Sequence, residues 1–275
     1  MRKYTIYNMG NIIKRDLNSS KKILILGCGW LGYRLANHLK EKDYSVFTTT
    51  TKADKMELLQ KEGLNPFLCD INDNLEALKS FFLDMDVVVI TIPTPKNDKR
   101  EDLINRFSNL VKALKGFENK LFMMSSVGVY QNLSGRIQED IIGEEFLNEN
   151  ILSVETLLKT HFPQINILRL GGLMGDNRVF KKFYTFKNPL ETVNHVHYKD
   201  ICLVVERLIN SEIQGEIFNV VASKHPTRQE VYEFQTLGKQ TNYLFDEGNS
   251  KVVLSTKLSS MLNYSFEFDD PNTMC

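Results

Sequence analysis

Residues 23–32 read ILILGCGWLG, four apolar residues that lead directly into three closely spaced glycines. A short apolar run is typical of a strand that is covered on both faces, as in a parallel sheet. A helical pattern follows over residues 30–42, and residues 45–49, SVFTT, carry the β-branched and aromatic side chains that strands favour. The three segments predict one strand–helix–strand unit.

The same alternation continues along the chain. Strands are expected at residues 66–69, 86–91, 120–124, 165–170 and 217–221, and helices at residues 55–61, 75–82, 102–114, 199–210 and in a segment that ends near residue 160. Strands that alternate with helices predict an α/β protein with a doubly wound parallel sheet, the Rossmann arrangement. In such sheets ligands lie beyond the carboxyl ends of the strands.

The glycines of GCGWLG have the spacing of the dinucleotide-binding fingerprint, and they stand between a strand and a helix, as that fingerprint requires. Gly27 can make the tight turn, Gly29 lets the backbone approach a pyrophosphate, and Gly32 lets the helix pack close to the strand. Trp30 and Leu31 open the helix, whose N-terminus offers N–H groups and a partial positive charge to an anion. The alternative is a glycine-rich turn without a ligand.

The end of the second strand bears on the choice between NAD and NADP. NAD-selective sites place a carboxylate there to hold the ribose hydroxyls, whereas residues 48–52 of this chain read TTTTK. The hydroxyls of Thr50 and Thr51 and the ammonium of Lys52 can bind a 2′-phosphate. NADP is therefore the expected cofactor and NAD the alternative, and Lys52 could instead be a solvated residue at a helix start.

Three further residues are candidates for the cofactor site because they end or follow strands at the same edge. Asp70 comes after the third strand and is expected either to accept a hydrogen bond from the adenine amino group or to cap a helix. Thr91 and Pro93 end and follow the strand at residues 86–91. We expect all three near a bound dinucleotide.

Residues 123–130, MMSSVGVY, leave the fifth strand at the edge where a nicotinamide is expected. Together with GCGWLG, three further runs fall in family order: ILRLGGLMG at 167–175, VNHVHYKD at 193–200 and IFNV at 217–220. Over residues 22–271 the chain thus resembles the extended short-chain dehydrogenase/reductases, in particular their atypical branch of NAD-dependent epimerase/dehydratase-like proteins. The resemblance implies that Ser126 is a catalytic residue that holds a substrate oxygen and that Ser125 contacts the cofactor. A strand-end turn is the alternative for both.

One departure from the family pattern concerns the acid–base group. The family carries a Tyr-x-x-x-Lys pair on the next helix, one helical turn apart. None of the ten tyrosines here is followed by a lysine four residues later, and the resemblance places Leu147 and Ile151 in the two positions. Tyr130 is the second catalytic candidate, with a packed aromatic as its alternative, and Glu139 is a weaker substitute. Arg169, inside an apolar strand, is expected to be paired or to face a ligand.

Composition limits the partners. The 34 Lys and Arg balance the 34 Asp and Glu, so the chain lacks the positive charge that a nucleic acid needs. The longest mainly apolar stretch, residues 87–92, is far shorter than the roughly 18 residues of a membrane span. We expect a small-molecule substrate and a monomer or homodimer. The cysteines lie far apart without zinc-ligand spacing, which predicts reduced thiols, no metal site and a cytoplasmic protein; they are Cys28, Cys69, Cys202 and Cys275.

Three regions are expected in the chain. Residues 1–21 form a loose N-terminal extension without the apolar run of a secretory signal, and Met9 is an alternative start. Residues 22–170, with 199–221 added to them, form the dinucleotide-binding domain. Residues 171–275 form a smaller substrate cap, because glycines and prolines interrupt the periodicity there.

Two functions are compatible with these features. One is an NAD(P)-binding oxidoreductase or epimerase-like enzyme that acts on a small, sugar-nucleotide-like substrate without the usual Tyr-Lys pair. The other is an NADP(H)-binding sensor or scaffold without catalysis, which the missing pair favours.

Overall fold

The computed structural model describes residues 20–95, 98–131, 133–140, 147–179, 188–242 and 250–274. The chain packs as two compact units. Unit 1 comprises residues 1–124 and 153–166, and unit 2 comprises residues 125–152 and 167–275. Most of the expected N-terminal extension and Cys275 lie outside the described residues, and the assignment of residues 171–275 to a substrate cap stays a prediction.

Strands and helices alternate as the sequence predicts. The elements that lie wholly or mainly in unit 1 are β1 (Lys22–Leu26), α1 (Trp30–Glu41), β2 (Ser45–Thr50), α2 (Ala53–Lys61), β3 (Asn65–Leu68), the 3-10 helix η1 (Glu76–Leu78), α3 (Lys79–Leu83), β4 (Val87–Ile90), α4 (Arg100–Ala113), β5 (Lys120–Ser126) and α5 (Glu149–His161). Those of unit 2 are η2 (Val127–Tyr130), β6 (Gly135–Ile137), β7 (Asn166–Leu170), β8 (Gly172–Met174), β9 (His195–His197), α6 (Tyr198–Ile209), β10 (Ile217–Val220), α7 (Arg228–Leu237), β11 (Lys251–Val253), α8 (Thr256–Leu262) and η5 (Pro271–Thr273).

The main sheet has seven strands in the order β10-β7-β5-β4-β1-β2-β3. β1 pairs in parallel with β2 on one side and with β4 on the other, and Leu26 lies opposite Ile90. The predicted doubly wound parallel sheet is therefore confirmed. Because successive connections run to opposite sides of β1, the carboxyl end of β1 is a topological switch point, where such sheets bind ligands.

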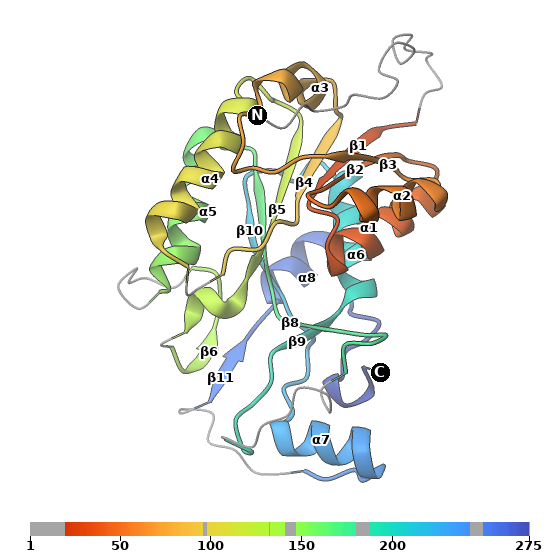
Figure 1. Ribbon diagram of the computed structural model, residues 1–275. Helices are drawn as coiled ribbons and strands as arrows, with labels where there is room; N and C mark the ends of the chain where they lie inside the picture. The colour runs from red at the N-terminus through yellow and green to blue at the C-terminus, as the bar shows by residue number, and fades with distance from the viewer. Residues whose placement is uncertain are drawn as a thin grey trace. The chain divides into compact units, whose positions relative to one another are not determined.

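The core of unit 1 forms around β1 and β4. Residues 23–26 and 88–90 have no solvent exposure at all, as their wholly apolar sequence predicts. α1 and α2 lie on one side of these strands and α4 and α5 on the other (Figure 1). α1 buries Leu31, Leu35 and Leu39, which share one helical face. Each fully buried aliphatic side chain stabilises the fold by roughly 1.5–3 kcal/mol, so this core fixes the β1–α1 turn.

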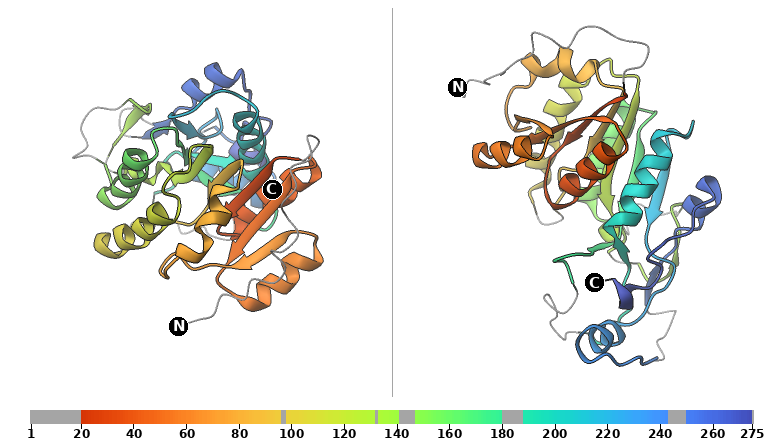
Figure 2. Two further views of the ribbon diagram at one scale, coloured as in Figure 1. Left: turned by 90° about the horizontal axis from the view of Figure 1, so that it is seen from above. Right: turned by 90° about the vertical axis from the view of Figure 1, so that its right-hand side faces the viewer.

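Unit 2 contains two further parallel pairs, β11 with β6 and β8 with β9. α7 contacts η5 near the end of the chain, and the two helices lie close together in both side views (Figures 1 and 2). Asp200, in the first turn of α6, is fully buried. Its carboxylate accepts hydrogen bonds from Tyr264 Oη at 2.5 Å and from the backbone N–H groups of Glu267 at 2.7 Å and Phe268 at 3.1 Å. One carboxylate thus anchors the C-terminal segment to α6.

Asp200→Asn is expected to destabilise unit 2 by about 2–4 kcal/mol, because hydrogen bonds to a charged acceptor contribute about 1.5–3 kcal/mol each and the amide NH₂ would face a backbone donor. Urea unfolding measures the loss, and amide exchange of Glu267 and Phe268 should accelerate with it. Asp269→Asn is the matched control, since Asp269 is half exposed and only 3.9 Å from Lys224 Nζ in a surface ion pair. Equal stability of the two variants would contradict the anchor.

No helix in the described parts of the chain is long and apolar enough to cross a lipid bilayer.

Candidate functional site

The first turn after β1 has the geometry that the glycine pattern predicts. Gly27 has φ of +101°, a left-handed conformation that L side chains rarely adopt. Its N–H donates to Thr49 Oγ1 at 2.8 Å, and the N–H of Cys28 donates to the carbonyl oxygen of Thr49 at 2.7 Å. The loop is therefore held against the end of β2.

Gly32 makes the close helix–strand approach expected of the third glycine. A Cβ atom there would overlap the carbonyl oxygen of Gly27 and lie 2.8 Å from Thr91 Oγ1. The Thr91 hydroxyl itself donates to Gly27 O at 2.5 Å. Thr91 thus closes the turn from the end of β4, a structural use of a residue that the sequence suggested only as a cofactor contact.

Gly29 differs from the other two glycines, because a Cβ built on it would meet nothing within 4 Å. It is the N-cap residue of α1, with no side-chain cap and no acidic residue in the first helical turn. The helix start therefore has open space beside Gly29 and no carboxylate of its own in its first turn. These residues fit a pyrophosphate, which needs both the donors and the room.

The end of β2 carries threonines, as read from the sequence. Thr49 and Thr50 are buried, and Thr50 Oγ1 accepts a hydrogen bond from the backbone N–H of Lys52 at 3.2 Å. Thr51 and Lys52 are exposed, and Lys52 is the N-cap residue of α2. A further cation lies here that sequence reasoning missed: Lys55 Nζ, from the first turn of α2, donates to the carbonyl oxygen of Cys28.

Asp70 lies after β3 and organises a local turn. Its Oδ1 atom accepts hydrogen bonds from the backbone N–H of Asn72 at 2.9 Å and from Asn72 Nδ2 at 2.6 Å. The next helical segment has Leu75 as its N-cap residue, so Asp70 caps a turn rather than a helix. Pro93 follows β4 and is exposed. The roles of Asp70 and Pro93 toward a nucleotide stay predictions.

Ser125 and Ser126 are the last two residues of β5, which runs two residues further than expected. Ser125 is buried, and Ser126 is partly exposed. Ser126 Oγ accepts a hydrogen bond from the N–H of Gly128 at 3.0 Å and so caps η2. This is the strand-end turn that the sequence left as an alternative, and the proposed contact with a substrate oxygen remains a prediction.

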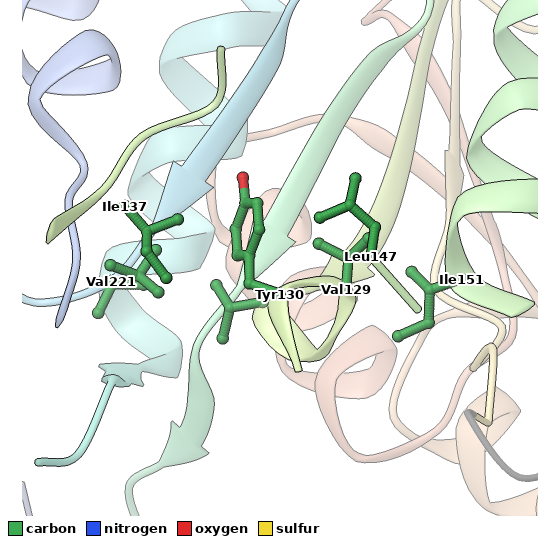
Figure 3. Packing of buried hydrophobic residues seen from close by; sticks show 8 residues of the cluster. Val129, Tyr130, Ile137, Leu147, Ile151 and Val221 are labelled. Carbon is green, nitrogen blue, oxygen red and sulfur yellow. The ribbon is translucent and has the colours of Figure 1, made fainter. Parts of the chain in front are cut away.

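Tyr130 is fully buried in an apolar cluster of unit 2 (Figure 3). Its hydroxyl accepts a hydrogen bond from Arg169 Nη1 at 2.7 Å and donates to Asn219 Oδ1 at 2.9 Å. The backbone N–H of Asn219 in turn donates to Glu139 Oε1 at 2.6 Å. The prediction that Arg169 is paired is confirmed, and this geometry favours the packed-aromatic alternative for Tyr130.

Glu139 belongs to the same network and is partly buried. Burial raises the pKa of its carboxyl group, an effect that the N–H of Asn219 and the charges of Lys257 and Arg169 oppose. A carboxyl group with a raised pKa can hold a proton closer to neutral pH. Glu139 therefore stays a candidate for proton transfer.

Leu147 and Ile151 belong to the cluster around Tyr130, with 8% and 2% of their surface exposed. Figure 3 shows both beside Val129. Ile151 lies in α5, whereas Leu147 precedes that helix by two residues. Neither side chain can move a proton, and both are packed as core residues.

His195 and His197 lie on β9. The ring of His197 stacks on Phe268 at a centroid distance of 3.8 Å, and Nδ1 accepts a hydrogen bond from the N–H of Lys199 at 3.4 Å. Burial lowers the pKa of each histidine to about 4. The described residues contain no group of three or more His, Cys, Asp or Glu side chains placed to hold a metal ion.

Comparison with known proteins places this geometry in a family. Protein YeeZ of Escherichia coli (strain K12) is 28% identical over 92% of this chain and 98% of its own length. The enzyme WbmG of Bordetella bronchiseptica, in complex with NAD, has a TM-score of 0.74 at 19% identity, over 94% of this chain and 93% of that one. UDP-glucuronic acid 4-epimerase of Bacillus cereus, in complex with NAD, has a TM-score of 0.69 at 21% identity, over 92% and 94% of the two chains.

These structures share the fold of this chain, which is the fold that the resemblance in the sequence motifs implied. The model of the NAD(P)H-binding family matches residues 27–212. The match begins at Gly27, the first glycine of the loop, and continues past β9 into the loop that follows α6. Because it covers more than half of the chain, the protein belongs to the NAD(P)H-binding family.

Proposed function

We propose that the protein binds NADP(H) on the loop of residues 27–32 and acts as an oxidoreductase or epimerase-like enzyme on a small, sugar-nucleotide-like substrate. The open space at Gly29, beside a helix start that lacks both a side-chain cap and an acidic residue, is the observation that carries the proposal. The nicotinamide group supplies or accepts a hydride when it is bound. The remaining work falls to residues of this chain.

NADP rather than NAD is proposed because β2 ends in threonines and is followed by Lys52, where an NAD site would have a carboxylate to hold the ribose hydroxyls. Thr50, Thr51 and Lys52 are the proposed contacts. The relatives whose structures contain NAD do not argue against this choice, since a likeness at 19% and 21% identity concerns the fold.

If the protein is an enzyme, Ser126 holds the reacting oxygen of the substrate by a hydrogen bond from its hydroxyl. That hydroxyl can still donate, because its contact with Gly128 uses only an oxygen lone pair. The positions of the family's tyrosine and lysine hold apolar core residues, so the proton must come from water or from a group such as Glu139. We therefore expect slow turnover, since a positioned acid–base group typically contributes about 10²–10⁴-fold.

A second candidate is an NADP(H)-binding sensor or scaffold without catalysis. The packing of Leu147 and Ile151 in the core favours it, as does the burial of the Tyr130 hydroxyl between Arg169 and Asn219. For either function we propose a cytoplasmic location and a monomer or homodimer.

Ser126→Ala is expected to lower the rate of NADPH oxidation at least tenfold, because the variant cannot hold the substrate oxygen. The assay follows NADPH absorbance with a panel of sugar-like carbonyl compounds, and Ser134→Ala is the control, since Ser134 is exposed in the same unit. Turnover that Ser126→Ala reduces supports the enzyme. NADPH binding without turnover of any compound supports the sensor, and equal rates for the variant and wild type would remove the role of Ser126.

A further inference from the structure

The glycine loop carries a cation that the fingerprint does not include. Lys55, in the first turn of α2, is partly buried, and its ammonium group donates a hydrogen bond to the carbonyl oxygen of Cys28. Cys28 lies between the first two glycines of the loop. Because side chains of a helix lean toward its N-terminus, a residue in the first turn of α2 can reach back to this loop.

The contact places positive charge where the loop meets the end of β2. The N–H of Cys28 donates to the carbonyl oxygen of Thr49 at 2.7 Å, so loop and strand end are joined at this residue. In dinucleotide sites the group that follows the second strand binds the 2′ position of the adenosine ribose, either a hydroxyl or a phosphate. Lys55 thus lies on the helix that follows the second strand, with its ammonium group held at the glycine loop.

The ammonium group keeps donors for a ligand. It carries three N–H bonds, and Cys28 O accepts one of them. Lys55 forms no ion pair with a carboxylate among the described residues. Burial raises the pKa of the Cys28 thiol to about 11, and the charge of Lys55 opposes this rise more strongly than the charge of Glu62 adds to it. The positive charge of Lys55 therefore acts on the glycine loop at Cys28.

Two other cations lie near the loop and are less suited to the task. The guanidinium group of Arg34 stacks on the ring of Trp30 at 3.8 Å and donates to the Trp30 carbonyl oxygen at 2.9 Å. Lys52 is exposed at the start of α2. A flexible, hydrated ammonium group there loses more hydration and more side-chain freedom when it binds a phosphate. Lys55 is the cation already oriented by the protein.

We propose that Lys55 is the residue that selects a nucleotide with a 2′-phosphate, with two of its N–H groups donating to the phosphate oxygens and the third to Cys28 O. This inference rests on the proposed binding of NADP(H) by the glycine loop. The preference for NADPH over NADH then depends on the ammonium group of Lys55 on α2, in addition to the residues at the end of β2.

The test is calorimetric titration of the full chain with NADPH and with NADH, for wild type and for Lys55→Met. Wild type is expected to bind NADPH about 10- to 100-fold more tightly than NADH, the range of one charge-assisted contact. Lys55→Met should lose most of that ratio while its affinity for NADH stays within about twofold, which also shows that the variant is folded. Lys61→Met removes the same charge from the exposed far end of α2 and should keep the ratio.

Three results would overturn the inference. Wild type that binds NADH as tightly as NADPH has no 2′-phosphate site. A loss of both nucleotides in Lys55→Met would make Lys55 a support of the loop rather than a selector. If Lys52→Met lost the preference for NADPH over NADH and Lys55→Met kept it, the selecting residue would be Lys52. Failure of wild type to bind either nucleotide would instead contradict the proposed function itself.

Discussion

Gly32→Ala is expected to destabilise the protein by about 1–3 kcal/mol and to abolish nucleotide binding. The added Cβ would overlap Gly27 O and press on Thr91 Oγ1, and both belong to a turn that is hydrogen-bonded to β1 and β4. Forcing an extra carbon into such a tightly packed place costs roughly that amount. Thermal unfolding and calorimetric titration with NADPH measure the two effects.

Gly29→Ala is the matched variant, with a different expected outcome. Nothing lies within 4 Å of its added Cβ, and Gly29 has a negative φ of −75°, so stability should change by less than about 1 kcal/mol. The new methyl group would occupy the space that the pyrophosphate needs, and affinity for NADPH should fall at least 30-fold. If Gly29→Ala instead bound NADPH like wild type, the diphosphate would not lie on this loop.

The second large effect is expected from acidification. The ring of His197 is 3% exposed, and burial, reinforced by the charge of Lys199 and opposed by that of Asp176, lowers its pKa to about 4. The pKa of His195 is also lowered, by burial and by the charge of Arg228. The folded state therefore keeps these rings neutral at pH values where the unfolded chain binds protons.

This difference in pKa between the folded and unfolded chain decides how the free energy of unfolding changes with pH. A depressed pKa stabilises the fold fully above the unfolded value of 6.5 and progressively less as the pH falls toward 4. His197 alone should remove about 2 kcal/mol of unfolding free energy between pH 7.5 and pH 5, and His195 adds to the loss.

Urea unfolding at the two pH values tests this dependence. His197→Leu should weaken it, whereas His161→Gln, an exposed position at the end of α5, should leave it as in wild type. Equal unfolding free energies at pH 7.5 and pH 5 would contradict the burial of these rings.

The sequence predicted the features that depend on neighbours along the chain. The run at residues 23–26 is buried on both faces of the sheet, as expected when every residue of a strand is apolar. Gly32 packs closely against the turn because a helix that starts so soon after a strand leaves no room for a side chain. Both follow from local geometry.

Features that depend on distant residues could not be predicted in this way. Lys55 meets Cys28 across 27 positions, and Asp200 meets Tyr264 across 64. Nothing in the pattern of α2 marks one of its lysines as different from the others. Each contact depends on where two elements lie in the folded chain, and a single sequence does not encode that distance in any local pattern.

The residues around Tyr130 show the same limit. Its position in the SSVGVY run made it a catalytic candidate, whereas the fold surrounds its hydroxyl with Arg169 and Asn219, which lie 39 and 89 positions away. The absence of a tyrosine–lysine pair was visible in the sequence. That Leu147 and Ile151 fill a core in its place became visible only in the structure.

Binding of the nicotinamide nucleotides to the unmodified protein is the most direct test of whether the loop of residues 27–32 holds a dinucleotide. Titration of the full chain with NADPH in a calorimeter should give a saturable signal with one site per chain, together with a rise in the melting temperature as the ligand concentration increases. The same titration of Gly29→Ala should give little or no heat at an unchanged melting temperature of the ligand-free protein. Absence of heat and of thermal stabilisation with both NADPH and NADH would show that the loop of residues 27–32 holds neither nucleotide.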